Sequence, residues 1–140
     1  MKGVELIKIP TITDQRGNLS VSELNKDFPF EVKRIFWIYG IPENEERAAH
    51  AHRHQAQVLI SLAGKFTLIL DDGKSKETLI MDNPSEGLLV PPGVWITLNN
   101  FSKGSVCLVL APESYDEFEY LRDYNDFLEW KNSNNAFLIN

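Results

Sequence analysis

Hydrophobic residues recur in short runs along this chain, and turn-forming residues separate the runs. Short runs rich in β-branched and aromatic side chains are typical of β-strands. Asp72-Gly73, between two such runs, is a strong hairpin signal. Many short strands at near-regular spacing predict a closed barrel or a sandwich. We expect strands at residues 4–9, 19–24, 32–39, 57–62, 66–70, 77–81, 87–90, 95–98 and 106–110.

The pattern changes near the end of the chain, where residues 114–130 are acidic and aromatic. We expect one or two short helices in this segment, packed on the β-structure or across a dimer. The apolar positions at helical spacing are Phe118, Leu121, Tyr124 and Leu128, with Tyr120 and Phe127 beside them.

Length and composition indicate one domain that spans residues 1–140. The hydrophobic fraction of 43% and the charged fraction of 24% are ordinary for a globular protein. No apolar run is long enough to cross a membrane, and residues 1–10 lack the pattern of a secretory signal. We therefore expect no membrane association.

The formal net charge of −6 disfavours nucleic acid as a partner. An anionic small ligand requires only that arginines gather locally. The single cysteine, Cys107, cannot form an internal disulfide, so a cytoplasmic location is the default expectation. Cys107 lies in an apolar run, and we expect it to be part of the core rather than a nucleophile.

The main chemical signal is a pair of histidines, His50 and His52, separated by one residue. Alternate residues of a strand face the same side, so the two imidazoles project together. Paired imidazoles inside a β-rich domain indicate either a metal site or proton-transfer chemistry. His54 shares that face if the strand extends so far, but a solvated edge position between Arg53 and Gln55 is an equal alternative.

The spacing around these histidines resembles that of the cupin superfamily. His-x-His, four residues, Gln57, six residues and Gly64 match the first cupin motif, with Gln in the place of Glu. Residues 91–100 match the second motif, Pro-x-Gly, two residues, His, three residues, Asn, with Ile96 in the place of His. The resemblance implies an all-β, jelly-roll-like barrel with two of four metal ligands replaced. Ile96 cannot bind a metal and neutral Gln57 is a poor ligand, so we expect no metal or other cofactor.

A longer set of motifs occurs in order over residues 14–127. The motifs are Asp14-x-Arg16-Gly17, Lys33-Arg34, Arg47-x-x-His50-Ala51-His52, Gln57-Val58-Leu59, Leu70-Asp71-Asp72-Gly73, Pro91-x-x-Val94-Trp95, Asn100-Phe101-Ser102 and Tyr115-Asp116-Glu117. This ordered set resembles the dTDP-4-oxo-6-deoxyhexose 3,4-ketoisomerases. The resemblance implies a metal-free cupin homodimer that moves a carbonyl from C4 to C3 of a nucleotide-linked 6-deoxysugar. Such products feed the aminotransferases that make 3-amino sugars for surface polysaccharides.

Carbonyl transposition requires a proton to leave C3, an enediol to form, and a proton to reach C4. Two acid–base groups on one face of the sugar suit this reaction, and we expect His50 and His52 to divide the roles. The Gln57 amide can donate a hydrogen bond to the enediolate oxygen, although a barrel-lining residue bonded to a neighbour is an equal alternative.

A sugar nucleotide also carries a diphosphate and a base. Arg16, Arg34 and Arg47 are the candidates for the diphosphate, because guanidinium offers a planar fork to phosphate oxygens. Each arginine can instead pair with a surface carboxylate. Trp95 can stack on the thymine or the sugar, although a buried core tryptophan is the commoner outcome.

The chain departs from similar enzymes at two places. They tend to carry Tyr-Tyr where this chain has Phe36-Trp37, so a phenol that could relay a proton is absent there. Tyr39, on the same side of the strand as Trp37, is a catalytic candidate that would replace it, or else a core or rim aromatic. Ala48-Ala49 stand where a Gly and an aromatic are usual.

We predict a metal-free 3,4-ketoisomerase. The alternatives are a sugar-nucleotide-binding cupin without catalysis and, less favoured, a metal-dependent cupin enzyme.

Overall fold

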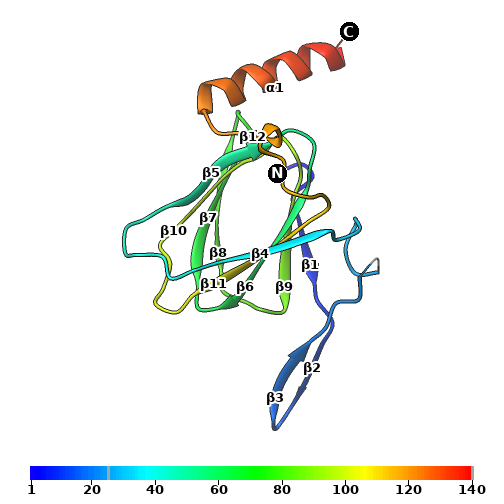
Figure 1. Ribbon diagram of the computed structural model, residues 1–140, viewed down its shortest axis with the longest axis vertical. Helices are drawn as coiled ribbons and strands as arrows, with labels where there is room; N and C mark the ends of the chain where they lie inside the picture. The colour runs from blue at the N-terminus through cyan, green and yellow to red at the C-terminus, as the bar shows by residue number, and fades with distance from the viewer. Residues whose placement is uncertain (25, 140) are drawn as a thin grey trace.

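The computed structural model describes residues 1–24 and 26–139, which form two antiparallel sheets, a separate hairpin and a C-terminal helix (Figure 1). The first sheet has the order β1 (Glu5–Lys8), β9 (Glu86–Val90), β6 (Gln57–Ala63), β11 (Val106–Ala111), β4 (Arg34–Tyr39). The second has the order β12 (Tyr120–Leu121), β5 (Arg47–His52), β10 (Trp95–Asn99), β7 (Phe66–Asp71), β8 (Lys76–Met81). The hairpin pairs β2 (Thr11–Asp14) with β3 (Gly17–Ser20).

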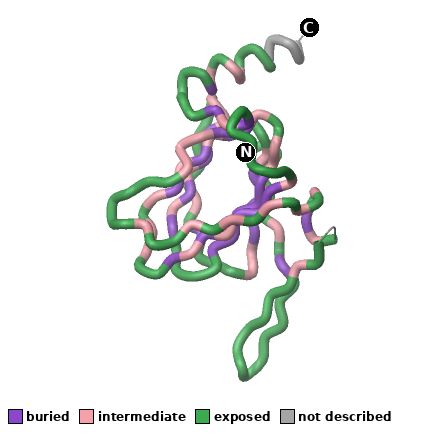
Figure 2. The backbone as a smooth tube through the Cα atoms, in the orientation of Figure 1, coloured by how far each residue is buried: buried purple, intermediate pink, exposed green. Residues whose placement is uncertain are grey.

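The main core lies between the two sheets, where alternate residues of each strand point inward. Leu68 and Leu98 from the second sheet meet Leu59 and Val109 from the first, and all four are almost completely buried. Figure 2 shows the buried positions concentrated along these strands, whereas the β2–β3 hairpin is exposed throughout. The expected all-β architecture is confirmed. Within the described residues no backbone ladder joins one sheet to the other, so the two sheets form a sandwich rather than a hydrogen-bonded closed barrel.

Two predicted strands are shorter than expected. The strand expected at 19–24 ends at Ser20, and the one expected at 32–39 begins at Arg34. The other predicted strands agree with the structure to within two residues.

The segment expected to be helical from residue 114 is not helical at its start. It begins with a short 3₁₀ turn (Glu117–Glu119) and the strand β12, and α1 (Tyr124–Ile139) starts only afterwards. Leu121 is buried because it belongs to the strand that pairs with β5, whereas Phe118 is 76% exposed. The apparent helical spacing therefore joined residues of three different elements.

The start of α1 packs on the outer face of the second sheet. Phe127 is fully buried there against Ala51 and Leu121. The Tyr124 hydroxyl donates a 2.7 Å hydrogen bond to the buried carboxylate of Asp71 at the end of β7. This contact fixes the helix to the sandwich.

Cys107 is fully buried in the main core, and burial raises the pKa of its thiol to about 12. The prediction that Cys107 is part of the core is confirmed. In the stretches that the structure describes, no helix is long and apolar enough to span a bilayer.

Candidate active site

A one-residue bulge in β5 shapes the strand that carries the histidines. Ala48 pairs with Thr97 and His50 pairs with Ile96, so Ala49 is left without a partner in the ladder. Ala48 and Ala49 have φ of 67° and 55°, left-handed values that residues other than glycine rarely adopt. Such bulges bend a strand and redirect its side chains. The unusual Ala48-Ala49 pair in the sequence therefore lies at the bulge itself.

The bulge brings Arg47 and His50 to the same face of β5. Residues three apart on a regular strand point to opposite faces. Here Arg47 pairs with Leu98 and His50 with Ile96, and both of these partners are buried in the core between the sheets. Arg47 and His50 accordingly line one cavity.

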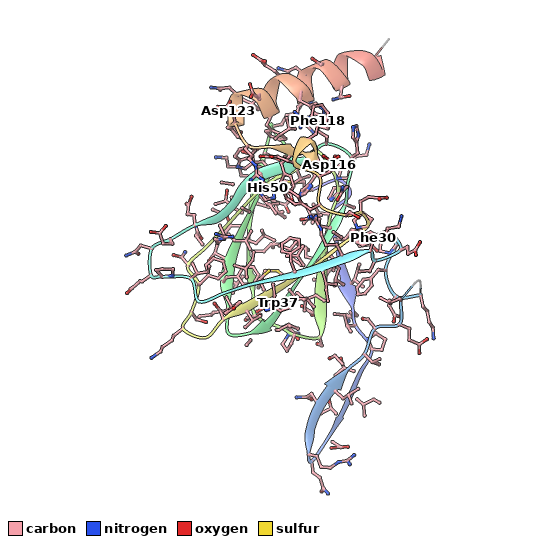
Figure 3. The ribbon with its side chains drawn as sticks, in the orientation of Figure 1. Phe30, Trp37, His50, Asp116, Phe118 and Asp123 are labelled. Atoms are coloured by element: carbon pink, nitrogen blue, oxygen red, sulfur yellow. The ribbon has the colours of Figure 1, made fainter. Side chains whose placement is uncertain are left out.

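That cavity has a volume of about 380 Å³ and lies between the two sheets. Figure 3 shows His50 close below the segment that carries Asp116 and Phe118, at the end of the sandwich nearest α1. Its apolar lining includes Phe36 and Leu59. The polar side chains in the lining include Arg47, His50, Gln57, Tyr120 and Arg122.

His50 and His52 lie side by side, with ring centroids 5.1 Å apart in an edge-to-face arrangement. The ring of Tyr120 contacts both, at 4.9 Å from His50 and 4.6 Å from His52. His52 is only 5% exposed. Within the described residues, Nδ1 of His50 and both ring nitrogens of His52 are buried without a hydrogen-bond partner. Buried polar atoms are normally paired. His50 lines the cavity and His52 packs against His50, so these unpartnered nitrogens favour a ligand site here.

Burial makes both imidazoles poor proton acceptors at rest. Loss of hydration lowers the pKa of His50 to about 4, and the Arg122 guanidinium acts in the same direction. Loss of hydration also lowers the pKa of His52 to about 3, with further contributions from His50, Arg34 and Arg122. Both rings are therefore neutral at neutral pH.

Gln57, at the start of β6, is 3% exposed and lines the same cavity. Its amide nitrogen, Nε2, has no hydrogen-bond partner in the described part of the chain. A buried amide donor that faces a cavity beside two imidazoles is available to an oxygen of a bound molecule.

Two of the predicted arginines lie near the histidines and one does not. Arg47 is at the cavity, and Arg34 lies over the rings of Phe36 and Tyr115, close enough to His52 to lower its pKa. Arg16 lies at the tip of the β2–β3 hairpin, which projects from the sandwich on the side away from α1 (Figure 1).

The Arg16 side chain is 85% exposed, and its Nη2 is 2.7 Å from Oδ2 of Asp14. This ion pair holds the pKa of the Asp14 carboxyl below its usual range.

Three other predicted residues are not brought to the centre of the site. Trp95 is on the outer face of β10, where it packs on Tyr124 and Phe127 at centroid distances of 5.3 and 5.6 Å. Tyr39 is 66% exposed and lies at the cavity rim, on the opposite face of β4 from Phe36. His54 lies beyond the end of β5 and is exposed.

Sequence reasoning missed Tyr120 and Arg122 as site residues, because the segment that carries them was interpreted as a helix. The guanidinium carbon of Arg122 lies 4.5 Å from the centroid of the Tyr120 ring. A signal that could have found them is the basic Arg122 two positions after Tyr120 in an otherwise acidic segment. A short strand that returns to pair with the His-x-His strand gives no distinctive pattern of its own.

The buried carboxylate of Glu119 ties this segment to β5. It accepts hydrogen bonds from the backbone N–H groups of His54, at 2.7 and 3.0 Å, and Gln55, at 2.8 Å. The guanidinium of Arg53 donates in return to the carbonyl oxygens of Phe118 and Tyr120. These contacts fix Tyr120 beside the histidines.

The site offers few donor atoms to a metal ion. Among the side chains that the structure describes, no three of His, Cys, Asp or Glu lie close enough together to hold a metal ion. Ile96, opposite His50 in the ladder, contributes no donor atom.

Residues 2–132 match the protein family described as FdtA: WxcM-like, C-terminal. The TDP-4-oxo-6-deoxy-alpha-D-glucose-3,4-oxoisomerase of Aneurinibacillus thermoaerophilus is 40% identical over 126 residues, which cover 90% of this chain and 91% of that protein. These matches extend over nearly the whole sequence.

Solved structures are similar over the same extent. A 3,4-ketoisomerase from Helicobacter canadensis superposes with a TM-score of 0.88 at 39% identity, covering 92% of this chain and 97% of that one. A mutant of the 3,4-ketoisomerase QdtA from Thermoanaerobacterium thermosaccharolyticum, solved in complex with TDP-4-keto-6-deoxyglucose, has a TM-score of 0.92 at 34% identity, covering 95% and 96%. The predicted cupin-type fold is thereby confirmed.

Proposed function

Since the chain belongs to the FdtA family, whose relatives are TDP-sugar 3,4-ketoisomerases, we propose that it moves the carbonyl of a dTDP-4-keto-6-deoxyhexose from C4 to C3. It is an isomerase. The observation that carries the proposal is the pair of buried imidazoles, with three ring nitrogens unpartnered in the described residues, beside a cavity of about 380 Å³. Such a cavity is of the size that holds a small ligand.

We assign the proton transfers at carbon to His50 and His52. One neutral imidazole takes the proton from C3, and the C–H electron pair forms the C3=C4 double bond of an enediol. A proton returns to C4 from the other ring, and the proton is passed between the two rings or exchanged with solvent. Because burial lowers the pKa of both rings, the imidazolium formed in the first step is a strong acid and readily gives its proton up.

Gln57 is proposed to stabilise the enediolate. Its buried Nε2–H group is a neutral donor beside the imidazoles, and a donor that is already in place is most effective where charge develops. A glutamate in this position would present two acceptor oxygens to the developing anion instead.

The reaction is proposed to need no metal. His50 and His52 are the only two of the four cupin ligand positions that carry a histidine here. Ile96 brings no donor atom, and Gln57 is a weaker ligand than a carboxylate. Two imidazoles alone leave a divalent ion under-coordinated.

Cations near the histidines are proposed to bind the diphosphate. Arg34, Arg47 and Arg122 lie around this part of the molecule, although the net charge of the whole chain is −6. Guanidinium groups can make bidentate contacts with phosphate oxygens. Replacing Arg122 by Ala should raise KM more than it lowers kcat.

We propose that the working form is a homodimer. The outer face of β4 exposes Ile35, Trp37 and Tyr39, each more than half accessible. The projecting hairpin exposes Ile12 and Leu19 in the same way. Patches of this kind mark protein contacts, and a second copy buries both.

In such a dimer, the hairpin tip is proposed to carry Arg16 to the cavity of the partner subunit. Arg16→Ala chains should have a raised KM, and His52→Asn chains should be inactive. Mixing the two then creates heterodimers with one intact site, and activity at low substrate concentration returns. Recovery of no activity on mixing, with heterodimers demonstrated by native mass spectrometry, would place Arg16 outside the site.

The function is tested by proton NMR of TDP-4-keto-6-deoxyglucose incubated with chelator-treated protein. A new 3-keto species supports the proposal, and its coupling constants give the configuration at C4. Binding of the nucleotide with an unchanged sugar would support a binding protein without catalysis. Activity that disappears with the chelator and returns with a stoichiometric metal would support a metal-dependent enzyme.

A further inference from the structure

Tyr120 is the tyrosine that the fold places against the histidines. The chain has four tyrosines, and all lie in the described part. The side chains of Tyr39 and Tyr115 are 66% and 59% exposed. Tyr124 donates its hydroxyl hydrogen to Asp71 on the other face of the sheet. Tyr120 alone of the four has ring contacts with both imidazoles, at 4.9 and 4.6 Å.

Several contacts hold Tyr120 in this position. Its backbone pairs with His52 in the ladder between β12 and β5, and its carbonyl accepts a 3.0 Å hydrogen bond from Arg53. The Arg122 guanidinium covers the ring at 4.5 Å. Tyr120 also lines the cavity. A phenol fixed in this way is pre-organised for contact with a bound sugar.

The proposed isomerisation moves two protons, and the histidines account for one of them. The C3 proton moves to C4, and the hydroxyl proton on O3 must also move to O4. These two oxygens are neighbours on the sugar, so one group that both gives and accepts a proton can serve both. Phe36, which faces the cavity from β4, has no hydroxyl to do so.

We propose that Tyr120 is a catalytic residue that transfers the oxygen protons of this reaction; the inference rests on the proposed function. As His50 or His52 takes the C3 proton, the carbonyl π electrons move to O4, and O4 takes the phenol proton of Tyr120. The enediol then loses its O3 proton to the phenolate, C3=O forms, and C4 takes a proton from an imidazole. Tyr120 ends as a phenol, so the cycle balances without a further reactant.

The test is Tyr120→Phe, which keeps the ring against both imidazoles and removes only the hydroxyl. We expect kcat to fall at least about 100-fold while the affinity for TDP changes less than about twofold. The matched control is Tyr124→Phe, which removes a hydroxyl on the other face and should leave kcat unchanged. A Tyr120→Phe enzyme with wild-type kcat overturns the inference, and so does an equal loss in both variants.

A second measurement covers the case in which Tyr120→Phe fails to fold. Fluorotyrosine incorporated at position 120 keeps the shape of the side chain and makes the phenol more acidic. If Tyr120 transfers protons, the alkaline limb of the kcat profile moves to lower pH; an unmoved limb overturns the inference. Wild-type protein in the same assay separates the two proposals. If the wild type is inactive, the proposed function fails, whereas an active wild type isolates the role of Tyr120.

Discussion

The two faces of β5 and β10 have opposite chemistry, although their residues alternate along the same strands. The inner face carries His50 and His52, whose ring nitrogens are largely unpartnered in the described residues. The outer face carries Ala51 and Trp95, packed under α1, where Phe127 is fully buried. There the Tyr124 hydroxyl donates a 2.7 Å hydrogen bond to Oδ2 of Asp71.

The two faces differ in whether their buried polar atoms have hydrogen-bond partners, and this difference distinguishes a ligand site from a structural core. An unpaired buried donor or acceptor costs about 1–3 kcal/mol, so a cluster of such groups beside a cavity favours a functional role over a structural one. On the outer face the Tyr124 hydroxyl donates a hydrogen bond to the buried Asp71 carboxylate, and this contact stabilises the fold. The inner face leaves its imidazoles and the Gln57 amide free for a ligand. Changes on the inner face should therefore affect activity, and changes on the outer face should affect stability.

The largest expected effect is on the inner face. Replacing His50 or His52 by Asn should reduce kcat by about 10²- to 10⁴-fold, because the proton transfers at carbon lose their acid or base. The matched control is His54→Asn, an exposed histidine next to the same strand, which should keep full activity. Steady-state kinetics with circular dichroism of each variant checks this. Full activity in both His50→Asn and His52→Asn would contradict the claim that the inner face is the active site.

On the outer face, Phe127→Ala should lower the free energy of unfolding by about 3–5 kcal/mol, because a fully buried aromatic ring leaves a cavity. The kcat of the molecules that remain folded should be unchanged. Urea denaturation measures the first quantity and active-site-normalised kinetics the second. A variant of wild-type stability but reduced kcat would show that α1 acts on the site rather than on the fold.

Acid pH should weaken the fold through the inner face. The pKa values of His50 and His52 are about 4 and about 3 in the folded chain, below the ordinary 6.5. Below pH 6.5 the unfolded chain therefore binds protons that the folded chain does not. The free energy of unfolding should fall with decreasing pH by up to about 1.4 kcal/mol per pH unit for each histidine.

Denaturation curves at pH 7.5 and pH 5 test this sign and its source. The His50→Asn/His52→Asn double variant should lose less stability over the same interval. If the double variant and the wild type lose the same amount, other groups cause the acid sensitivity and the histidines are better hydrated than their burial indicates.

The smallest expected effect is that of Tyr124→Phe, which removes one hydrogen bond from the outer face. The free energy of unfolding should fall by about 1 kcal/mol, a value typical of a single hydrogen bond with a partly exposed donor. Urea denaturation measures it. A loss of several kcal/mol would mean that the buried Asp71 carboxylate depends on this one partner.

Much of the fold could be predicted from the sequence because the strands are short, regular and bounded by turn residues. The alternation that places His50 and His52 on one face also holds in the structure. The bulge at Ala48 and Ala49 could not be predicted, because two alanines give no signal for left-handed φ. As a result, only the pairing of β5 with β10 shows that Arg47 and His50 lie on the same face.

The errors at the C-terminal segment have a physical cause as well. Aromatic residues recur there at intervals that fit a helix. Tyr120 and Leu121 instead form a short strand, because their backbone pairs with β5. Ile96 faces the core between the sheets, so alternation directs Trp95 outward, and the position of α1 provides the residues that cover it there. Contacts between segments that are distant in the sequence determine the structure at both places, and local sequence patterns do not predict such contacts.

The most direct measurement is proton and deuterium NMR of TDP-4-keto-6-deoxyglucose with the protein in deuterated water. If the imidazoles of the inner face transfer the proton, the wild type forms a 3-keto product that carries solvent deuterium at C4. The His50→Asn/His52→Asn double variant, folded and still able to bind TDP, forms none. Formation of the same product at the same rate by the double variant would contradict the account.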